Sequence, residues 1–521
     1  MREGSAVRAG SRALAPARPS RPTCPAHRLD RHPGYRRHPS RKDATHPQLS
    51  SLRAQHDLPQ HGDRTQKLES RAQVSTLPQL QPRCFEDLAV AASIIRPGPI
   101  QAGSKHPYLR RRAGLEPVTY PHPLAEPALS KTLGVPLWQE QAMALAIDCA
   151  GFTPGEADRL RKAMAAKNSP EKVAQLRGRL FAGIAAKGID QAASERIVGM
   201  IEAFSDYGFP QSHAQSMAGI IYASAWVKYH FPQALLAAIM AHLPMGFYDA
   251  QTLIQDAKQH GIEVRGVELQ RSGVHATLEP HTDRPEQRPA IRRGLTSVAG
   301  ISEEIAEQIL TARGTAAFRS VADVARRTRL SAKLMEQLAT AGAFDGLGVD
   351  RRTALWSAGA YTGEIQDVLP GLDDLAPAPE LPVMTAAEAT AADLEASGAS
   401  ATTHPAQHLR ALLASHGAQP AREARDLADQ TRVRVGGLAK YIQRPPTARG
   451  VAFGALEDET GMINLVFSPP VWERTREAVL GAPAVLLEGH IERDRGSVNM
   501  IVHRAHALAG PARAHQPGRF R

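Results

Sequence analysis

Two different spacings of apolar residues divide this chain, and such spacing decides which regular structure a segment can form. Between residues 137 and 240 apolar residues recur at intervals of three and four, as they do within 197–204. This period is typical of helices that bury one face. From residue 431 onward apolar and polar residues alternate, as within 463–467, which is typical of strands. The chain is therefore expected to be multidomain and mainly α, with a small β domain following the helices.

Start and stop signals divide the helical part further. Threonine, serine and aspartate side chains cap the first turn of a helix, and proline fits its first position. In the last predicted helix Ile220, Ser224 and Val227 share one stripe, which predicts its buried face. The predicted helices run from the capping box Thr153-Pro154-Gly155-Glu156 to about Ala166, from Ser169-Pro170-Glu171 to before Gly188, from the cap Asp190, and from the cap Ser212 to Pro232.

Three further segments follow this helical domain, which we expect to end near residue 270. Residues 291–347 look like two short helical hairpins in tandem. Residues 357–430 are rich in Ala, Pro and Asp, which predicts a loosely structured linker with short helices. From 431 to 510 the pattern predicts four or five short strands with one helix near 471–480, and hence a small OB-like β-barrel.

The positive charge of the chain is concentrated near its N-terminus. Lys plus Arg number 63 against 52 Asp plus Glu, a net charge of +11 with a pI near 9.7. Residues 1–68 hold 14 of the basic and 5 of the acidic residues, so they carry +9 of that charge. The same segment contains 8 Pro and one aromatic residue, Tyr35, a composition that predicts a disordered N-terminus. The global pI therefore says little about the folded part.

The cysteines and the hydropathy indicate a compartment. Cys24, Cys84 and Cys149 are far apart and match no metal or disulfide spacing, so reduced structural thiols are expected. No apolar run reaches the roughly 18 residues of a membrane-spanning helix. The N-terminus does not have the pattern of a secretory signal. A soluble, cytoplasmic protein is predicted.

Basic residues cluster at two places in the helical part. A cluster of this kind is usually a solvated face. Alternatively, several flexible cations at one helix end can neutralise a triphosphate or a nucleic-acid backbone. The spacing alone leaves both interpretations open. The two clusters are Arg110, Arg111 and Arg112, and Arg159, Arg161, Lys162 and Lys167.

A second candidate for anion binding follows the turn at Tyr207-Gly208-Phe209. Ser212 and His213 open the next predicted helix, where free backbone amides and the helix dipole favour an anion. The alternative is that Ser212 only caps the helix and His213 only lies at the surface. These residues are therefore candidates for binding a phosphate group.

The hairpins and the barrel are candidates for binding DNA. A hairpin turn that contains glycine lets backbone amides face a DNA phosphate without reading bases, although an ordinary helical linker is the alternative. An OB-like barrel can bind single strands through a basic groove and aromatic stacking. For Phe453 a place in the barrel core is the favoured role. The candidate DNA contacts are Gly300, Ser302 and Arg313 in the hairpins, and Tyr441, Arg444, Arg449 and Phe453 in the barrel.

Several longer motifs run through the chain, namely Arg96-Pro97-Gly98-Pro99-Ile100-Gln101, His106-Pro107-Tyr108-Leu109, Trp138-Gln139-Glu140-Gln141, Ala157-Asp158-Arg159-Leu160-Arg161-Lys162-Ala163-Met164, Tyr207-Gly208-Phe209 with Ser212-His213, and Ala225-Trp226-Val227-Lys228. Together they closely resemble the C-family bacterial DNA polymerases, the family of the DNA polymerase III alpha subunit. The resemblance covers residues 69 to about 510, with hairpins and barrel in the family's order. Pro244-Met245-Gly246-Phe247-Tyr248 looks like the error-prone branch.

The resemblance implies template-directed DNA synthesis from deoxynucleoside triphosphates in translesion repair and induced mutagenesis. Residues 69–270 would be the end of the palm and the helical fingers, 271–356 the tandem helix-hairpin-helix, and 511–521 a tail. The implied partners are primer-template DNA, deoxynucleoside triphosphates, a Y-family-like accessory protein and a recombinase-like factor. A sliding clamp is expected only indirectly, and no membrane.

The resemblance also assigns a role to the two anion candidates. It implies that Arg161, Lys162, Lys167, Ser212 and His213 lie near the incoming triphosphate, which favours the phosphate clamp over the solvated face. Lys162 replaces the commoner arginine, which keeps the charge but loses the bidentate fork.

Departures from the family bear on activity. Its PHP domain, palm and thumb lie upstream of residue 69, where the similarity begins abruptly, and its catalytic aspartates lie in that part. Nucleotidyl transfer uses Mg²⁺ ions held by closely spaced carboxylates, and no Asp-x-Asp on a plausible strand occurs in 69–300. No catalytic or metal-binding residue is therefore assigned, and Mg²⁺ is expected by family only. We expect an N-terminally truncated chain that is inactive alone.

Smaller departures leave other interpretations open. Met217 stands where the family often has an aromatic residue, and Gln366–Leu369 lacks the terminal aromatic of a clamp-binding box. Residues 1–68 are a basic tail, a transit peptide or sequence outside the native reading frame, and the abrupt start of similarity favours the last. The alternative functions are a non-catalytic DNA-binding module and an accessory of a mutagenic repair complex.

Overall fold

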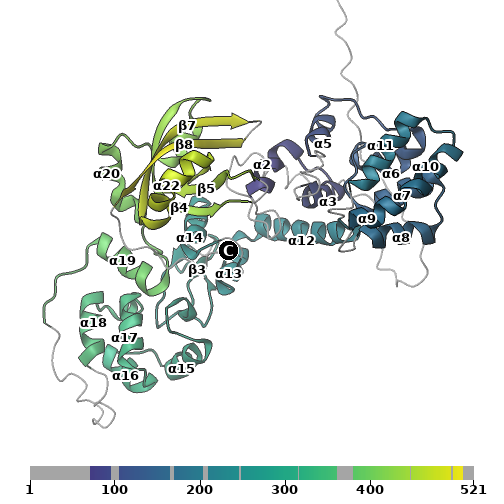
Figure 1. Cartoon of the computed structure of the whole chain (residues 1–521). Helices are drawn as coiled ribbons and strands as arrows, with labels where there is room; N and C mark the ends of the chain where they lie inside the picture. The colour runs from purple at the N-terminus through teal and green to yellow at the C-terminus, as the bar shows by residue number, and fades with distance from the viewer. Residues whose placement is uncertain are drawn as a thin grey trace, which may run out of the picture. The chain divides into compact units, whose positions relative to one another are not determined.

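The computed structural model describes residues 71–94, 105–164, 169–203, 209–245, 248–284, 286–314, 316–360, 379–445, 448–494 and 497–508 (Figure 1). The chain divides into two compact units, Met1–Pro47 and Gln48–Arg521, and every described residue belongs to the second. The predictions for residues 1–68, for Gln366–Leu369 and for the tail 511–521 lie outside the described residues.

The helices between residues 71 and 230 surround two hydrophobic cores. One core is centred on α7, where Leu145 packs with Leu160 of α8. The other joins α3 to α12 through Leu88, Trp138 and Ile221. The helices are α2 (Arg71–Leu80), α3 (Phe85–Ile94), α5 (Lys105–Arg112), α6 (Glu126–Leu129), α7 (Gln139–Ala150), α8 (Pro154–Met164), α9 (Ser169–Gln175), α10 (Arg177–Ala186), α11 (Gln191–Glu202) and α12 (Gln211–His230).

The predicted helix starts are mostly confirmed. Thr153 and Glu156 form the capping box of α8, because each side chain accepts the other's backbone N–H, at 3.3 and 2.8 Å respectively. The Asp190 carboxylate accepts the N–H of Ala193 and caps α11. The single helix expected from Ser169 is instead two, α9 and α10, which are separated at Leu176. Gly178 follows this break, and glycine is a weak helix former.

The start and the buried face of α12 differ from the prediction. The helix begins at Gln211, so Pro210 is its N-cap and Ser212 lies within the first turn. Its buried residues are Ala214, Ala218, Ile221 and Ala225, whereas Ile220 is 41% exposed. The reason is close packing on the alanine-rich α3, which selects small side chains rather than the largest apolar ones.

Residues 232–292 connect this helical part to the hairpins through a small sheet that the sequence pattern did not predict. Strand β1 pairs parallel to β3, and β2 pairs antiparallel to β3. Strands of two or three residues are too short to show an alternating pattern, which explains why this sheet was missed. The elements are α13 (Pro232–Ala241), α14 (Ala250–Gln259), β1 (Val264–Arg265), β2 (Thr277–Glu279) and β3 (Ala290–Arg292).

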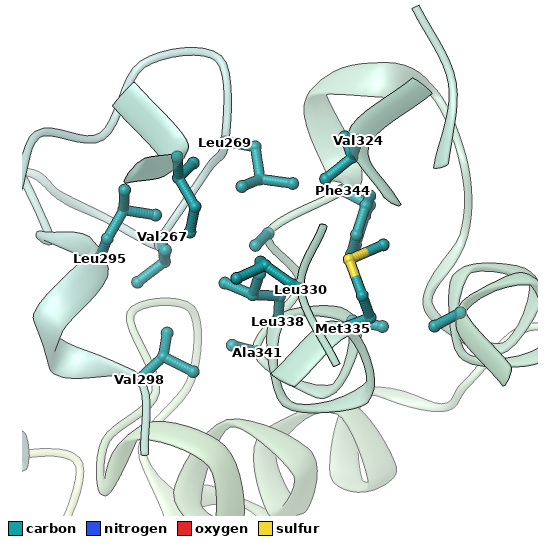
Figure 2. Packing of buried hydrophobic residues seen from close by; sticks show 14 of the residues in the cluster. Val267, Leu269, Leu295, Val298, Val324, Leu330, Met335, Leu338, Ala341 and Phe344 are labelled. Carbon is teal, nitrogen blue, oxygen red and sulfur yellow. The ribbon is translucent and has the colours of Figure 1, made fainter. Parts of the chain in front are cut away.

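The hairpin region packs around one core. Figure 2 shows Val324 of α16, Met335 and Leu338 of α17, and Phe344 converging on the segment around Leu269. All five side chains are less than 2% exposed, so the short helices are held together by this core rather than by their length. The helices are α15 (Glu303–Arg313), α16 (Val321–Thr328), α17 (Ala332–Thr340) and α18 (Arg351–Ala360).

The predicted linker contains the expected short helices, but from residue 386 to 426 they are packed rather than loose. The guanidinium of the buried Arg293 donates to Ser397 and to the carbonyl of Ala399 at 2.7–2.8 Å. The N–H of Ala299 donates to the carbonyl of Ala396 at 2.7 Å. These bonds hold α19 against the first hairpin. The helices are α19 (Ala386–Ser397), α20 (Arg410–Ser415) and α21 (Ala421–Asp426).

The C-terminal strands close into a barrel with the order β4-β5-β6-β8-β7. All pairs are antiparallel except β6 with β8. Along the chain, α22 connects β6 to β7. A closed five-stranded barrel of this kind agrees with the predicted OB-like fold. The elements are β4 (Arg432–Gln443), β5 (Ala452–Glu457), β6 (Met462–Phe467), α22 (Pro469–Gly481), β7 (Ala484–Asp494) and β8 (Ser497–Leu508).

Membrane insertion was not expected, and within the described ranges no helix combines the length and the apolar character needed to span a bilayer. The longest of the described helices, α12, carries its apolar residues interspersed with polar ones.

Candidate nucleotide-binding and DNA-binding sites

The basic cluster of α8 lies at the exposed end of a well-anchored helix. Ala157, Leu160 and Met164 are buried in the α7 core, which turns the intervening residues outward. Arg161 and Lys162 are therefore exposed, with 41% and 68% of their side chains accessible. Four residues of one helix end thus combine three cations with a single carboxylate. They are Asp158, Arg159, Arg161 and Lys162.

Asp158 organises two of these cations. Its Oδ1 accepts from Arg161 at 2.8 Å, and its Oδ2 lies 2.9 Å from Nζ of Lys162. Hydrogen bonds from Lys162 and then from Arg161 hold the pKa of Asp158 below its ordinary value. Because all three side chains are solvated, these bonds are weak and exchangeable.

The α8 cluster therefore keeps a net charge of +2 when Arg159, which is exposed, is included. A triphosphate carries more negative charge than Asp158 and offers more acceptor oxygens, so it can compete for the same cations. The chemistry this arrangement permits is electrostatic binding of a phosphate chain. Lys167, the remaining predicted member, lies outside the described residues.

Ser212 and His213 lie in the first turn of α12, and both are exposed. The ring of His213 meets the ring of Phe209 edge to face, with 5.4 Å between centroids. The first amide of the helix is already occupied, because the N–H of Gln211 donates to Oε2 of Glu140 at 2.8 Å. The expectation that Ser212 caps the helix is therefore wrong, since the cap comes from α7.

The two predicted parts of the phosphate clamp are not joined directly. Among the described residues no hydrogen bond or ion pair links Arg161 or Lys162 to Ser212 or His213. Tyr207 and Gly208, which precede α12, lie outside the described residues. Whether one nucleotide engages both groups stays a prediction.

The three arginines of α5 form hydrogen bonds and ion pairs within the chain. Arg112 donates to both carboxylate oxygens of Asp87, at 2.7 and 2.8 Å, and to the carbonyls of Leu80 and Gln81. Only 17% of its side chain is exposed. This residue fastens α5 to α2 and α3, which is a structural role that the sequence reading did not anticipate.

The other two arginines of that run share a carboxylate. Arg111 and Arg110 both pair with Glu116, at 3.2 and 3.0 Å, and Arg111 also donates to the carbonyl of Leu133 at 2.8 Å. Only Arg110 is half exposed, so within this run it keeps the most accessible charge. The DNA-binding role of all three arginines stays a prediction.

The first hairpin offers less to a DNA phosphate than its sequence suggests. Gly300 has a left-handed φ of +85°, as such a turn requires, and Ser302 caps α15 by accepting the N–H of Ile305 at 3.3 Å. Two exposed acids, Glu303 and Glu304, follow directly. They place negative charge in the first turn of α15, directly after the turn that was predicted to face a phosphate.

Arg313, at the far end of α15, is also engaged within the chain. Its Nη1 donates to the carbonyls of Leu269 and Ser272, at 3.0 and 3.1 Å. These bonds attach the helix to the loop between β1 and β2. As with the α5 run, the cation holds the fold, and its predicted contact with DNA is untested.

The barrel presents its candidate residues at one end of β4 and β5. Arg444 is half exposed and lies 3.2 Å from Glu473 of α22, while Arg449 is exposed. A bulge between Lys440 and Gln443 accompanies a left-handed φ at Tyr441, which is half-buried. The β4–β5 connection therefore carries two cations, of which Arg444 is ion-paired with α22.

Phe453 is not a core residue, contrary to the sequence prediction. It is half-buried and lies outside the barrel's hydrophobic cluster, which takes Ala452 and Leu456 from the same strand. Its cross-strand neighbours are Gln443 and Val466. The even positions 452, 454 and 456 of β5 are buried, so the alternation was assigned to the wrong face of the strand. Residues 455 and 457 are buried as well, so the burial pattern of β5 does not alternate regularly.

Glu140 is a functional candidate that the sequence motif Trp138-Gln139-Glu140-Gln141 contains but does not explain. Spacing along the chain could not reveal its contact, since Glu140 contacts a residue 71 positions away.

Within the described part of the chain, no group of three or more His, Cys, Asp or Glu could hold a metal ion. DNA polymerases use divalent metal ions, but the described residues offer no cluster of ligands that fits one.

Comparison with known proteins agrees with this architecture. Residues 65–188 match the model of the bacterial DNA polymerase III alpha subunit finger domain, and residues 261–354 match a helix-hairpin-helix motif. In its finger domain and its hairpins this chain resembles the C-family polymerases, as its motifs predicted.

Its relatives lie on the error-prone branch. The chain is 46% identical to the error-prone DNA polymerase of Mycobacterium tuberculosis over 440 residues, which is 84% of this chain and 40% of that protein. It is also 46% identical to the error-prone DNA polymerases of Anaeromyxobacter sp. over 447 residues and Corynebacterium efficiens over 444, covering 85% of this chain in each case. The chain thus spans about 40% of the length of these relatives.

Proposed function

We propose that this chain forms the fingers, hairpins and OB-like barrel of an error-prone DNA polymerase. In this role α8 and the start of α12 bind the triphosphate of an incoming deoxynucleotide, while the barrel and hairpins hold primer-template DNA. The observation that carries the proposal is the exposed cation group of α8, Arg159, Arg161 and Lys162, on a helix fixed by a capping box and a buried face. Such a group suits a phosphate chain rather than a neutral ligand.

The wider role follows from the family alone. The proposal includes template-directed synthesis in translesion repair. It also includes a Y-family-like accessory protein, a recombinase-like factor and an indirect link to the sliding clamp. Because bacterial chromosomal DNA lies in the cytoplasm, we propose that the chain acts there. We also propose that it extends a primer only together with the family's palm.

A second candidate function is a DNA-binding module without chemistry of its own. One observation favours it, the row of half-buried cross-strand neighbours Phe453, Val466 and Ile501, which continues to Gln443, the residue before Arg444. Apolar and aromatic groups next to cations suit a single strand whose bases stack while its phosphates are neutralised. This function and the first can coexist in one chain.

Nucleotide binding tests the first proposal directly. The purified chain is titrated with a fluorescent deoxyadenosine triphosphate, and the double variant R161A/K162A is compared with the natural sequence. We expect the dissociation constant to rise at least tenfold in the double variant. R177A is the matched control, because Arg177 is also exposed and ion-paired within the same helical part, with Glu202. Equal affinity of all three proteins would refute the clamp.

A primer-extension assay separates the two functions. With Mg²⁺, primer-template and all four nucleotides, we expect no extension by this chain alone. Extension by the purified chain would show that it needs no separate palm. A gel-shift series with the same DNA then tests the binding module, whose affinity should fall as salt rises.

A further inference from the structure

The four residues Trp138, Gln139, Glu140 and Gln141 lie at the start of α7, and each makes a different bond. Nε1 of Trp138 donates to Oγ of Ser93 in α3 at 2.8 Å, and the indole is buried in the α3–α12 core. Oε1 of Gln141 accepts the N–H groups of Leu137 and Trp138, at 2.7 and 3.0 Å. The segment is therefore rigidly held at both ends.

The middle two residues of this segment reach α12. The N–H of Gln139 donates to the carbonyl of Phe209 at 3.0 Å, and Oε2 of Glu140 accepts the N–H of Gln211 at 2.8 Å. These two bonds fix the chain on either side of Pro210, just before Ser212 and His213. Phe209, whose carbonyl accepts from Gln139, also packs its ring edge to face on the ring of His213.

The bond from Glu140 replaces a cap that α12 lacks. Pro210 is the N-cap residue, and its side chain has no oxygen to accept an N–H from the first turn. A carboxylate at a helix N-terminus is favoured by the helix dipole, and a charge-assisted hydrogen bond is stronger than a neutral one. Glu140 supplies both from a different helix.

We propose that Glu140 is a positioning residue for the nucleotide site: it holds the first turn of α12 so that Ser212 and His213 face the triphosphate. This inference rests on the proposed nucleotide-binding function. Glu140 does not touch the nucleotide. It acts by keeping the first turn in one arrangement, and the apparent dissociation constant rises in proportion as the competent arrangement becomes less populated.

Three variants at two positions test the inference on the whole purified chain. E140A removes the acceptor, E140Q keeps an oxygen that can accept the N–H of Gln211, and D148A removes an acid two turns further along α7. With the fluorescent deoxyadenosine triphosphate as probe, we expect E140A to bind roughly tenfold more weakly, as it would if a tenth of the molecules stayed competent. E140Q should stay within about threefold of the natural chain, and D148A should equal it.

Hydrogen exchange provides a second readout that does not depend on nucleotide. Exchange of the backbone amide of Gln211, which donates to Glu140, should accelerate in E140A and remain slower in E140Q and D148A. Unchanged exchange in E140A would overturn the positioning role. Faster exchange with natural nucleotide affinity would also overturn it, because the turn would then not matter for binding.

The outcomes distinguish this inference from the function on which it depends. If R161A/K162A weakens nucleotide binding and E140A does not, only the role of Glu140 fails. If neither weakens it, or the natural chain does not bind the probe at all, the proposed nucleotide site fails and the inference fails with it. Weaker binding in both, with rescue by E140Q, supports both.

Discussion

A buried ion pair between α14 and the barrel leads to a prediction whose size follows from the structure. Nζ of Lys440 in β4 contacts Oδ2 of Asp249 and lies 3.9 Å from Oε2 of Glu457, which also accepts a hydrogen bond from Thr252 at 2.7 Å. Only 13% of the Lys440 side chain and 2% of the Glu457 side chain are exposed. Replacing lysine by methionine leaves both carboxylates without a counter-charge.

The expected cost of K440M is about 3–5 kcal/mol, the typical cost of breaking a buried pair by removing one partner. Burial alone would lower the pKa of Lys440, but the charges of Asp249 and Glu457 raise it above its ordinary value. Burial would likewise raise the pKa of Asp249, but Lys440 outweighs it and the pKa is lowered. The pair is therefore charged near neutral pH. Its stabilisation is lost in acid as pH falls through the lowered pKa of Asp249.

The assay is native-state hydrogen exchange on the amides of β4 and β5, which reports the free energy of opening of the barrel without requiring two-state unfolding of the whole chain. R434A is the matched control, because Arg434 is in the same strand and pairs with Glu488 while 52% exposed. That variant should cost at most about 1 kcal/mol. The combination K440M/D249N/E457Q should recover at least half of the loss. A K440M cost no larger than that of R434A would refute the reasoning.

Two further perturbations test the packing and the acid response. G183A in α10 should destabilise the α7 core by more than about 1 kcal/mol, since its Cβ would lie 1.9 Å from the carbonyl oxygen of Ala150, whereas G178A in the same helix meets nothing within 4 Å and should be neutral or stabilising. Thermal unfolding measured on both variants checks this, and equal melting temperatures would contradict it. Burial, and after it the charges of Lys440, Lys258 and Arg410, lower the pKa of His404 to about 3, although the charge of Asp249 acts in the opposite direction. Stability should therefore fall as pH drops below 6.5, by at most about 1.4 kcal/mol per pH unit from this proton, and H404N should be less sensitive in urea titrations at pH 6.5 and 5. Identical pH dependence in both proteins would rule the histidine out as the cause.

Regular patterns in the sequence were enough to predict the main elements. The capping box at Thr153 and the cap at Asp190 mark helices because a local side chain satisfies the first amides. The alternation after residue 431 predicts the barrel, since each strand is long enough to show a period of two. The small sheet of β1 to β3 was missed because its strands are too short to show any period.

Interactions between distant segments explain what the sequence could not predict. The buried face of α12 is set by alanines that match α3, so Ile220 is left exposed although it is the larger apolar residue. The cap of the same helix comes from Glu140, and no local sequence motif predicts this contact. The sequence shows which residue types are candidates for binding, but it does not show which residues they contact in the fold.

The exposed charge of this chain is smaller than its arginine content suggests, and this bears on how tightly it can hold DNA. Arg111, Arg112 and Arg313 are bonded within the fold, and the first hairpin carries two exposed acids. The barrel offers Arg444 and Arg449 beside an apolar row. If only those two cations neutralise phosphates, the logarithm of the DNA association constant should fall with the logarithm of salt concentration with a slope of about −2. A slope steeper than about −6 would mean that the cations now bonded within the chain are released to DNA, and that binding reorganises the fingers as well as the barrel.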